Sequence, residues 1–198
     1  MRFAPLLLLL TLRASADAPT TLPLAVHAGA DVTDAQIDAW VADANRYFEP
    51  GAVRFERVET HRIATERLEL HDNRDRHRFK RDLVERRINV FVVDTIHDPW
   101  PSAATRRAAA REGFEPSGRL GGAHIVAEGH RPSTYVIVRR GQMPLVLAHE
   151  LGHVLGAPHH PDPTNIMSYG RNRTHFSDEQ LELFNQRARR LVRTRSVR

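Results

Sequence analysis

The stretch from His149 to His159 reads H-E-L-G-H-V-L-G-A-P-H and is the most informative part of this chain. Two residues four apart on a helix lie on the same face, about 6 Å apart along its axis, so the imidazoles of His149 and His153 can reach one metal ion. Gly156 lets the helix stop in a left-handed turn, a conformation that residues with a Cβ resist. That turn brings His159 back toward the first two histidines as a third ligand.

Three imidazoles and one carboxylate are the components of a catalytic zinc site, which keeps its fourth coordination position open for water. We predict that His149, His153 and His159 bind one zinc ion through neutral ring nitrogens. Glu150 follows the first ligand directly, so its carboxylate lies near the metal without being forced to bind it. It is the candidate general base, which takes a proton from the zinc-activated water as that water attacks a peptide carbonyl. This is the chemistry of a metallopeptidase.

The pentapeptide H-E-x-x-H alone is short enough to occur by chance, and its alternative interpretation is a helix with two surface histidines. Gly156 and His159 at fixed offsets argue against that alternative, and residues 165–170 add a second element, N-I-M-S-Y-G. Together the two elements resemble the metzincin family of zinc endopeptidases, whose long zinc motif is followed by a Met-containing turn beneath the metal. The spacing from the third histidine to Met167 is similar to that of matrixins, whereas M-S-Y is more similar to serralysins.

The resemblance also assigns roles to residues of the turn. In serralysins and astacins a tyrosine two residues after the methionine is an extra zinc ligand that can swing away and donate a hydrogen bond to the tetrahedral oxyanion. Tyr169 is therefore a candidate catalytic residue, and the alternative is a core tyrosine that only closes the turn. We expect Met167 to support the site by packing, because a thioether is a soft ligand poorly matched to a three-histidine zinc.

The order of predicted elements extends the resemblance over most of the chain. Strands are predicted at residues 22–28, 53–58, 88–93, 123–127 and 134–139, and helices after the capping boxes Thr33/Gln36 and Ser177/Gln180 and from Pro144. Residues 59–87 are expected to form a loop leading into a short helix, and residues 94–120 a long surface connection. The resemblance implies an α+β, metzincin-like catalytic domain: a twisted mixed sheet packed on two long helices, with a zinc cleft. Gly121 to Ala127 would be the edge strand that pairs with an extended substrate.

Residues 1–16 have the layout of a secretory signal peptide, with Arg2, a run of leucines and the small-x-small site Ala14-Ser15-Ala16. This segment is too short to span a membrane as a mature anchor. We expect a secreted protein, extracellular or periplasmic, with no membrane anchor after cleavage. The alternative is a buried N-terminal helix.

The length of 198 residues suits one domain, which we place at residues 17–198 with a basic tail at about 192–198. The chain has no cysteine, so no disulfide stabilises it and no thiol can block the zinc. Only a short stretch separates the predicted cleavage site from the first predicted strand. We therefore expect the mature enzyme to need no removal of a folded propeptide.

The basic character of the chain is a weak argument for nucleic-acid binding. The formal charge of +5 falls to +3 when Arg2 and Arg13 leave with the signal peptide, since no acidic residue leaves with them. Arginines cluster at residues 74–87 and 187–198, and we interpret both clusters as solvated helix faces and a basic chain end. We expect no nucleic-acid partner.

The leading hypothesis is thus a secreted zinc endopeptidase, expected to be a monomer, that acts on proteins or peptides. The alternative is a secreted zinc-binding module that grips peptides or surfaces without cleaving them, and Glu150 argues against it because zinc binding needs no such carboxylate. An arginine-rich nucleic-acid binder fits only the tail. A structural calcium ion stays open, because the sequence does not show ligands for it, and no second zinc site can be assigned. His160 lies beside His159 but breaks the ligand spacing, so we expect it to be exposed or to contact a ligand from outside. The remaining histidines lack paired spacing and are expected to be surface or core residues: His27, His61, His71, His77, His97, His124, His130 and His175.

Overall fold

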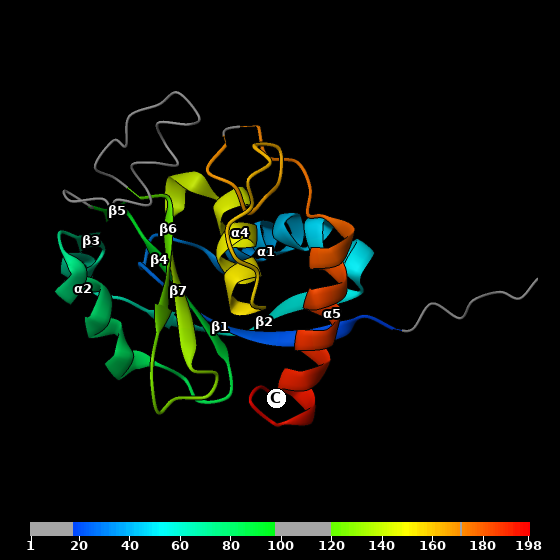
Figure 1. Cartoon of the computed structure of the whole chain (residues 1–198). Helices are drawn as coiled ribbons and strands as arrows, with labels where there is room; N and C mark the ends of the chain where they lie inside the picture. Colours follow the sequence, from blue (N-terminus) through cyan, green and yellow to red (C-terminus); the bar gives the residue numbers. More distant parts are fainter. Residues whose placement is uncertain (1–17, 98–119, 171) are drawn as a thin grey trace, which may run out of the picture.

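The computed structural model describes residues 18–97, 120–170 and 172–198 (Figure 1). The predicted signal peptide and most of the predicted connection at 94–120 lie outside these ranges. Within them, a five-stranded mixed sheet separates two layers of helices and short segments, one on each face (Figure 1).

The central sheet has the strand order β2-β1-β4-β7-β6. Its strands are β1 Thr20–Ala28, β2 Val53–Arg62, β4 Ile88–Val93, β6 Gly122–Val126 and β7 Thr134–Arg139. Neighbouring strands are parallel except β6 and β7, which form an antiparallel hairpin as predicted. Strand β4 is buried along its whole length, as expected for a central parallel strand. Strand β6 lies at the edge of the sheet, so within the described ranges one side of its backbone has no partner strand.

Among the described residues, three helices cover one face of the sheet. They are α1 Asp34–Phe48, α4 Leu145–Val154 and α5 Asp178–Arg193. Alternating side chains of the strands point toward them, because successive residues of a strand face opposite sides of the sheet. Helix α4 packs against β6 and β7, which places it beside the sheet edge. The fold class predicted from the sequence, a mixed sheet packed on helices, is confirmed.

The other face carries a smaller core beneath short elements. These elements are α2 Asn73–Arg78, the two-stranded sheet of β3 Glu69–Leu70 and β5 Thr95–Ile96, and the 3-10 turns Thr65–Arg67 and Phe79–Asp82. Two further 3-10 turns lie elsewhere in the chain, Glu49–Gly51 after α1 and Arg140–Gln142 before α4. Phe79 and Phe91 stack at the centre of this core, with ring centroids 4.2 Å apart. The segment predicted as a loop leading into a short helix is thus more structured than expected.

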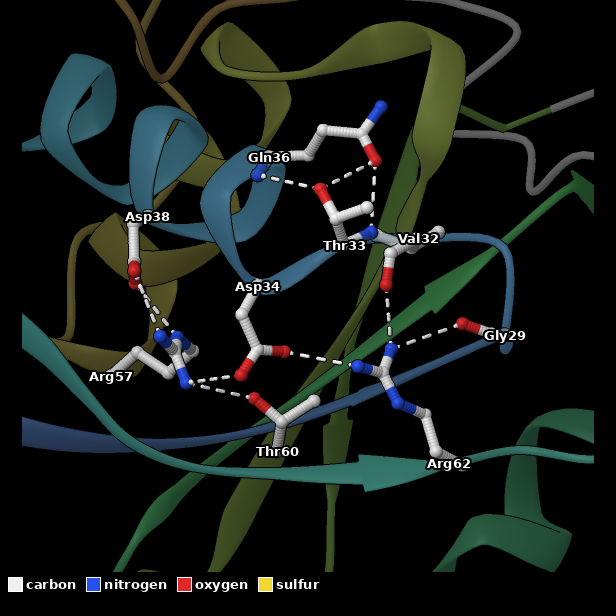
Figure 2. Close-up of polar contacts among 9 residues, drawn as sticks. All are labelled: Gly29, Val32, Thr33, Asp34, Gln36, Asp38, Arg57, Thr60 and Arg62. Atoms are coloured by element: carbon white, nitrogen blue, oxygen red, sulfur yellow. Dashed lines mark hydrogen bonds and ion pairs between the residues drawn. The ribbon is translucent and has the colours of Figure 1, made fainter.

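Helix α1 begins at the predicted capping box, which Figure 2 shows. The Thr33 hydroxyl accepts a hydrogen bond from the Gln36 backbone, and the Gln36 side chain accepts one from the Thr33 backbone at 2.8 Å. Arg57 of β2 binds Asp38 through two nitrogens, at 2.7 and 2.8 Å, and also reaches Asp34. These contacts fasten the first turns of α1 to the second strand.

Strand β2 is longer than the segment 53–58 predicted from its hydrophobic alternation. Its second half, up to Arg62, pairs with the end of β1 after an irregularity between Leu24 and Ala25. That half is largely polar and half-exposed, so it lacks the alternating pattern that marks a strand in sequence. Arg62 also donates to the backbone carbonyl of Val32 at 2.6 Å, which ties the strand end to the loop before α1 (Figure 2).

Helix α5 begins at the second predicted capping box, Ser177 and Gln180, and buries Phe184 and Ala188. Its aromatic residue Phe184 packs against Phe48 at the end of α1, with ring centroids 5.4 Å apart. Across the ranges that the structure describes, no helix has the length and apolar character needed to cross a membrane.

Candidate metal centre

Helix α4 ends in the turn that the sequence predicts. Gly156 adopts the left-handed conformation, with φ at +93°. Its backbone N–H donates to the His153 carbonyl at 2.9 Å, and the Ala157 N–H donates to the Gly152 carbonyl at 3.0 Å. This pair of bonds is the Schellman arrangement, which satisfies the last carbonyls of a helix and reverses the chain. The chain after α4 therefore passes back along the helix toward its first histidine.

The turn brings His149, His153 and His159 together as predicted. One ring nitrogen of each lies within 4.8 Å of those of the other two, and Nε2 of His153 is 3.2 Å from Nε2 of His159. Two nitrogens bound to one tetrahedral zinc are about 3.3 Å apart, given zinc–nitrogen bonds of about 2.0–2.1 Å. The donor set and its spacing therefore fit a zinc ion held by three imidazoles.

Hydrogen bonds at Nδ1 orient the two histidines of the helix. Nδ1 of His149 lies 2.7 Å from the carbonyl oxygen of Ile166, and Nδ1 of His153 lies 2.8 Å from that of Ala157. A carbonyl can only accept, so each Nδ1 carries the proton and each Nε2 presents a lone pair. A metal-binding histidine usually donates its other ring N–H to a carbonyl or carboxylate, which fixes the tautomer and the ring plane.

The third histidine is oriented by the predicted tyrosine. The hydroxyl oxygen of Tyr169 lies 3.1 Å from Nδ1 of His159, and the two rings lie 4.4 Å apart. In the state described here, Tyr169 therefore contacts the site through His159. Tyr169 comes from the segment that follows α4, so the same loop supplies the third histidine and the group that holds it.

Burial keeps the three imidazoles neutral. It lowers the pKa of His149 to about 3 and that of His159 to about 4, and it also lowers the pKa of His153. The cause is the loss of hydration, which disfavours the charged form of a base. Neutral imidazoles are the form that binds metal ions, so this part of the site needs no deprotonation near neutral pH.

Glu150 lies in the same helix, with 5% of its surface exposed. Burial raises the pKa of its carboxyl to about 8, an effect that Arg173 partly opposes. A cation held by the neighbouring histidines would favour the charged form and lower this pKa. Strand β6 passes directly over the carboxylate: a Cβ added to Gly122 would lie 2.6 Å from Oε1 of Glu150. The close contact requires glycine at this position and places the carboxylate against the sheet edge.

The predicted Met-containing turn, residues 165–170, lies against α4. Met167 is fully buried, and a Cβ added to Gly152 would lie 2.5 Å from its sulfur. The Asn165 side chain braces the turn, since its oxygen accepts from the Met167 backbone and its amide donates to the Gln180 side chain, both at 2.8 Å. The Gln180 side chain also completes the capping box of α5 with Ser177, so the start of the last helix and the turn under the site are joined by hydrogen bonds.

Two residues near the centre were not predicted from the sequence. Arg173 donates from Nη1 to the carbonyls of Ile166 and Ser168, each at 3.3 Å, and so reinforces the carbonyl that orients the first histidine. His124 of β6 has its ring centroid 5.7 Å from that of His153. His124 lies inside the predicted edge strand, which was the only sequence signal that could have placed it near the three histidines.

Elsewhere in the described ranges, no other group of histidine, aspartate or glutamate side chains is arranged to hold a metal ion. His27 is buried by the sheet and bonded to the Asn89 side chain at 3.0 Å, which fits its interpretation as a core histidine.

The sheet order, the helix layer and the three-histidine centre define a metzincin-like α+β fold. No protein-family model and no curated protein matches the sequence. Among solved structures, the chain is similar to archaemetzincin from Methanopyrus kandleri, with a TM-score of 0.57 and 14% sequence identity. The alignment covers 86% of this chain and 97% of that one. At this identity the similarity concerns the fold, and it does not extend to the matrixin-like spacing of the motif.

Proposed function

We propose that this protein is a zinc-dependent endopeptidase. The observation that carries the proposal is the cluster of ring nitrogens from His149, His153 and His159, together with the buried carboxylate of Glu150, which follows the first of these residues in α4. Three neutral imidazoles leave a coordination position for water, and a carboxylate next to that position is the general base that peptide hydrolysis requires. The similarity of the fold to archaemetzincin supports this proposal.

The proposed roles follow from position. When bound, zinc supplies Lewis-acid chemistry, which polarises a substrate carbonyl and lowers the pKa of water. Glu150 accepts the proton of the attacking water and passes it to the nitrogen of the leaving amine. The edge of β6 that has no partner strand among the described residues can pair with an extended peptide through backbone hydrogen bonds. Such pairing explains how the site would bind many sequences.

The hydroxyl of Tyr169 has two proposed roles in this mechanism. Its hydroxyl holds His159 in the described state, and a rotation of the side chain would free it to donate a hydrogen bond to the substrate oxygen as negative charge develops. The second duty follows the resemblance of the turn to those of serralysins and astacins.

The test is to measure zinc content and peptide hydrolysis in the same preparations. Wild-type protein should bind one zinc, cleave casein and lose that activity with a chelator. Glu150→Ala should keep the zinc and lose turnover, because it removes the base and leaves the three ligands. Glu128→Ala, which changes an exposed carboxylate of the β6–β7 hairpin, is the matched control and should behave as wild type.

Cleavage by Glu150→Ala at near the wild-type rate would overturn the assignment of the base. Zinc binding without cleavage by the wild type would favour the alternative of a peptide-binding module.

The proposal includes secretion, which the composition of residues 1–16 supports. Expression in a bacterial host followed by N-terminal sequencing of the exported protein tests it. We expect the exported chain to begin at Asp17, and a full-length chain retained in the cytoplasm would contradict this expectation.

A further inference from the structure

His124 has a ring nitrogen that lacks a partner. Its Nε2 atom is buried, and among the described residues no group hydrogen-bonds to it. Buried polar atoms without partners are rare in folded proteins because each one loses its hydration without compensation. An unpartnered nitrogen next to a metal-binding cluster therefore points to a partner that arrives with the metal or the substrate.

The position of His124 restricts what that partner can be. Residues two apart on a strand face the same side of the sheet, so His124 shares the face of β6 on which Gly122 lies against Glu150. Its ring centroid is 5.7 Å from that of His153, whereas the rings of the three predicted ligands lie 4.7 to 5.3 Å from one another.

The cluster of nitrogens within 4.8 Å of one another contains the three predicted ligands and leaves His124 out. His124 therefore lies beside the metal position rather than in it. An imidazole in that position can donate a hydrogen bond to an oxygen located at the metal.

We propose that His124 is a catalytic residue whose Nε2–H donates a hydrogen bond to the substrate carbonyl oxygen as it becomes tetrahedral. This inference rests on the proposed peptidase function. Strand β6 would then act twice, since its free edge pairs with the peptide backbone and its inner face supplies the donor. Because both groups belong to one rigid strand, a peptide in register with β6 would have its carbonyl oxygen held close to the donor.

The experiment compares His124→Phe, which keeps a ring, with His124→Gln, which keeps an N–H donor at similar reach. For each we would measure zinc content, thermal stability, kcat and KM, and the affinity for a phosphinic peptide that mimics the tetrahedral state. The affinity for the matched amide peptide is measured with Glu150→Ala as the parent, so that no cleavage occurs. His77→Phe, an exposed residue of α2, is the control.

We expect His124→Phe to lower kcat by roughly 10²–10³ and to leave KM within a few-fold, as for the loss of one oxyanion donor. Binding of the phosphinic peptide should weaken by about the same factor, while binding of the amide peptide stays unchanged. His124→Gln should recover part of both losses.

Unchanged kcat and unchanged phosphinic affinity in zinc-loaded His124→Phe would overturn the proposal and leave the peptidase function standing. Equal weakening of the phosphinic and amide peptides would also overturn it, because it would show ground-state binding only. A loss of zinc in both variants would also overturn the proposal, because it would show that His124 is needed to keep the zinc ligands in place. If the zinc-loaded wild type neither cleaves peptides nor prefers the phosphinic peptide, the proposed function itself fails.

Discussion

At the scale of single residues, the geometry of the candidate metal centre depends on the groups that hydrogen-bond to Nδ1 of the imidazoles, the ring nitrogen that does not face the proposed metal. His149 is held by the carbonyl of Ile166, and His159 by the hydroxyl of Tyr169. Both partners belong to the segment after α4, so the helix alone does not fix its own ligand geometry. Outer partners of this kind typically change metal affinity or activity by about 10–100-fold when removed.

Tyr169→Phe tests this outer contact, since it keeps the ring and removes only the hydroxyl. We expect zinc affinity to fall by about 10–100-fold, because His159 loses the partner at Nδ1. At saturating zinc, we also expect kcat to fall by about 10²–10³ if the hydroxyl serves the oxyanion as proposed. Competition with a fluorescent zinc chelator measures the first effect, and steady-state kinetics the second.

The two measurements separate the two duties of the hydroxyl. If Tyr169→Phe has the wild-type kcat at saturating zinc, the hydroxyl only orients His159. If the variant has the wild-type zinc affinity, the hydroxyl is not needed to orient His159. Tyr47→Phe, which removes the hydroxyl of a half-buried tyrosine in α1, is the control.

At the scale of elements, α4 and the Met-turn approach each other more closely than a side chain on the helix would allow. Gly152 in the interior of α4 is unfavourable for the isolated helix by about 1 kcal/mol relative to alanine. Its presence is explained by the sulfur of Met167, which occupies the space where a Cβ would stand. Gly152 thus lowers the intrinsic helix propensity of α4 but leaves the space that the turn needs to lie beneath the histidines.

Gly152→Ala should therefore destabilise the protein although it raises helix propensity. Overpacking a close contact typically costs about 1–3 kcal/mol, which exceeds the gain of about 1 kcal/mol in propensity. We expect a lower melting temperature and weaker zinc binding, measured by calorimetry and metal titration. The double variant Gly152→Ala/Met167→Ala should bring back part of the zinc affinity, because it removes the sulfur.

The control for this prediction is Gly141→Ala. A Cβ added there meets nothing within 4 Å, so its stability should change by a few tenths of a kcal/mol. Equal effects at Gly152 and Gly141 would show that the contact with Met167 does not decide the choice of glycine.

At the scale of the whole molecule, the sheet separates two cores of different character. The face covered by α1, α4 and α5 holds the larger apolar core, whereas the other face buries His27 between the rings of Phe91 and His61. Ring centroids lie 4.1 Å apart for His27 and Phe91, and His27 is 2% exposed. The protonation of His27 should therefore contribute to the pH dependence of the global stability, in addition to the titratable groups of the metal centre.

Burial lowers the pKa of His27 to about 4 in the folded protein, against about 6.5 in the unfolded chain. The unfolded state binds a proton between these values that the folded state does not bind. The contribution of His27 is thus fully present above pH 6.5 and is lost as the pH falls toward 4. An upper bound for the loss is about 3 kcal/mol.

His27→Phe should make the free energy of unfolding less dependent on pH between 6.5 and 4. The phenyl ring keeps the stacking on Phe91 and removes the proton, while the Asn89 oxygen keeps its bond from the Val84 backbone. Urea unfolding at several pH values measures the effect, with chelator present in all samples so that zinc release does not contribute. Parallel pH profiles for wild type and variant would contradict the pKa of His27, and His77→Phe serves as the control.

Much of the fold was predictable because its signals are local. The capping boxes at Thr33 and Ser177, the buried strand at 88–93 and the hairpin of β6 and β7 each depend on residues within a few positions of one another. The polar second half of β2 was missed, since its pairing with β1 comes from the neighbouring strand and not from its own alternation.

The sequence by itself determined that the three histidines come together, that Glu150 follows the first of them, and that the helix ends in a turn at Gly156. Helix geometry converts the spacing of these residues directly into proximity. Only the tertiary structure decided the strand order, the place of β6 over Glu150 and the approach of His124 to the site. These contacts join elements that are distant along the chain and depend on how side chains fill space between them. No spacing rule encodes such packing, and so the residues that complete the site appeared only once the sheet and the helices were assembled.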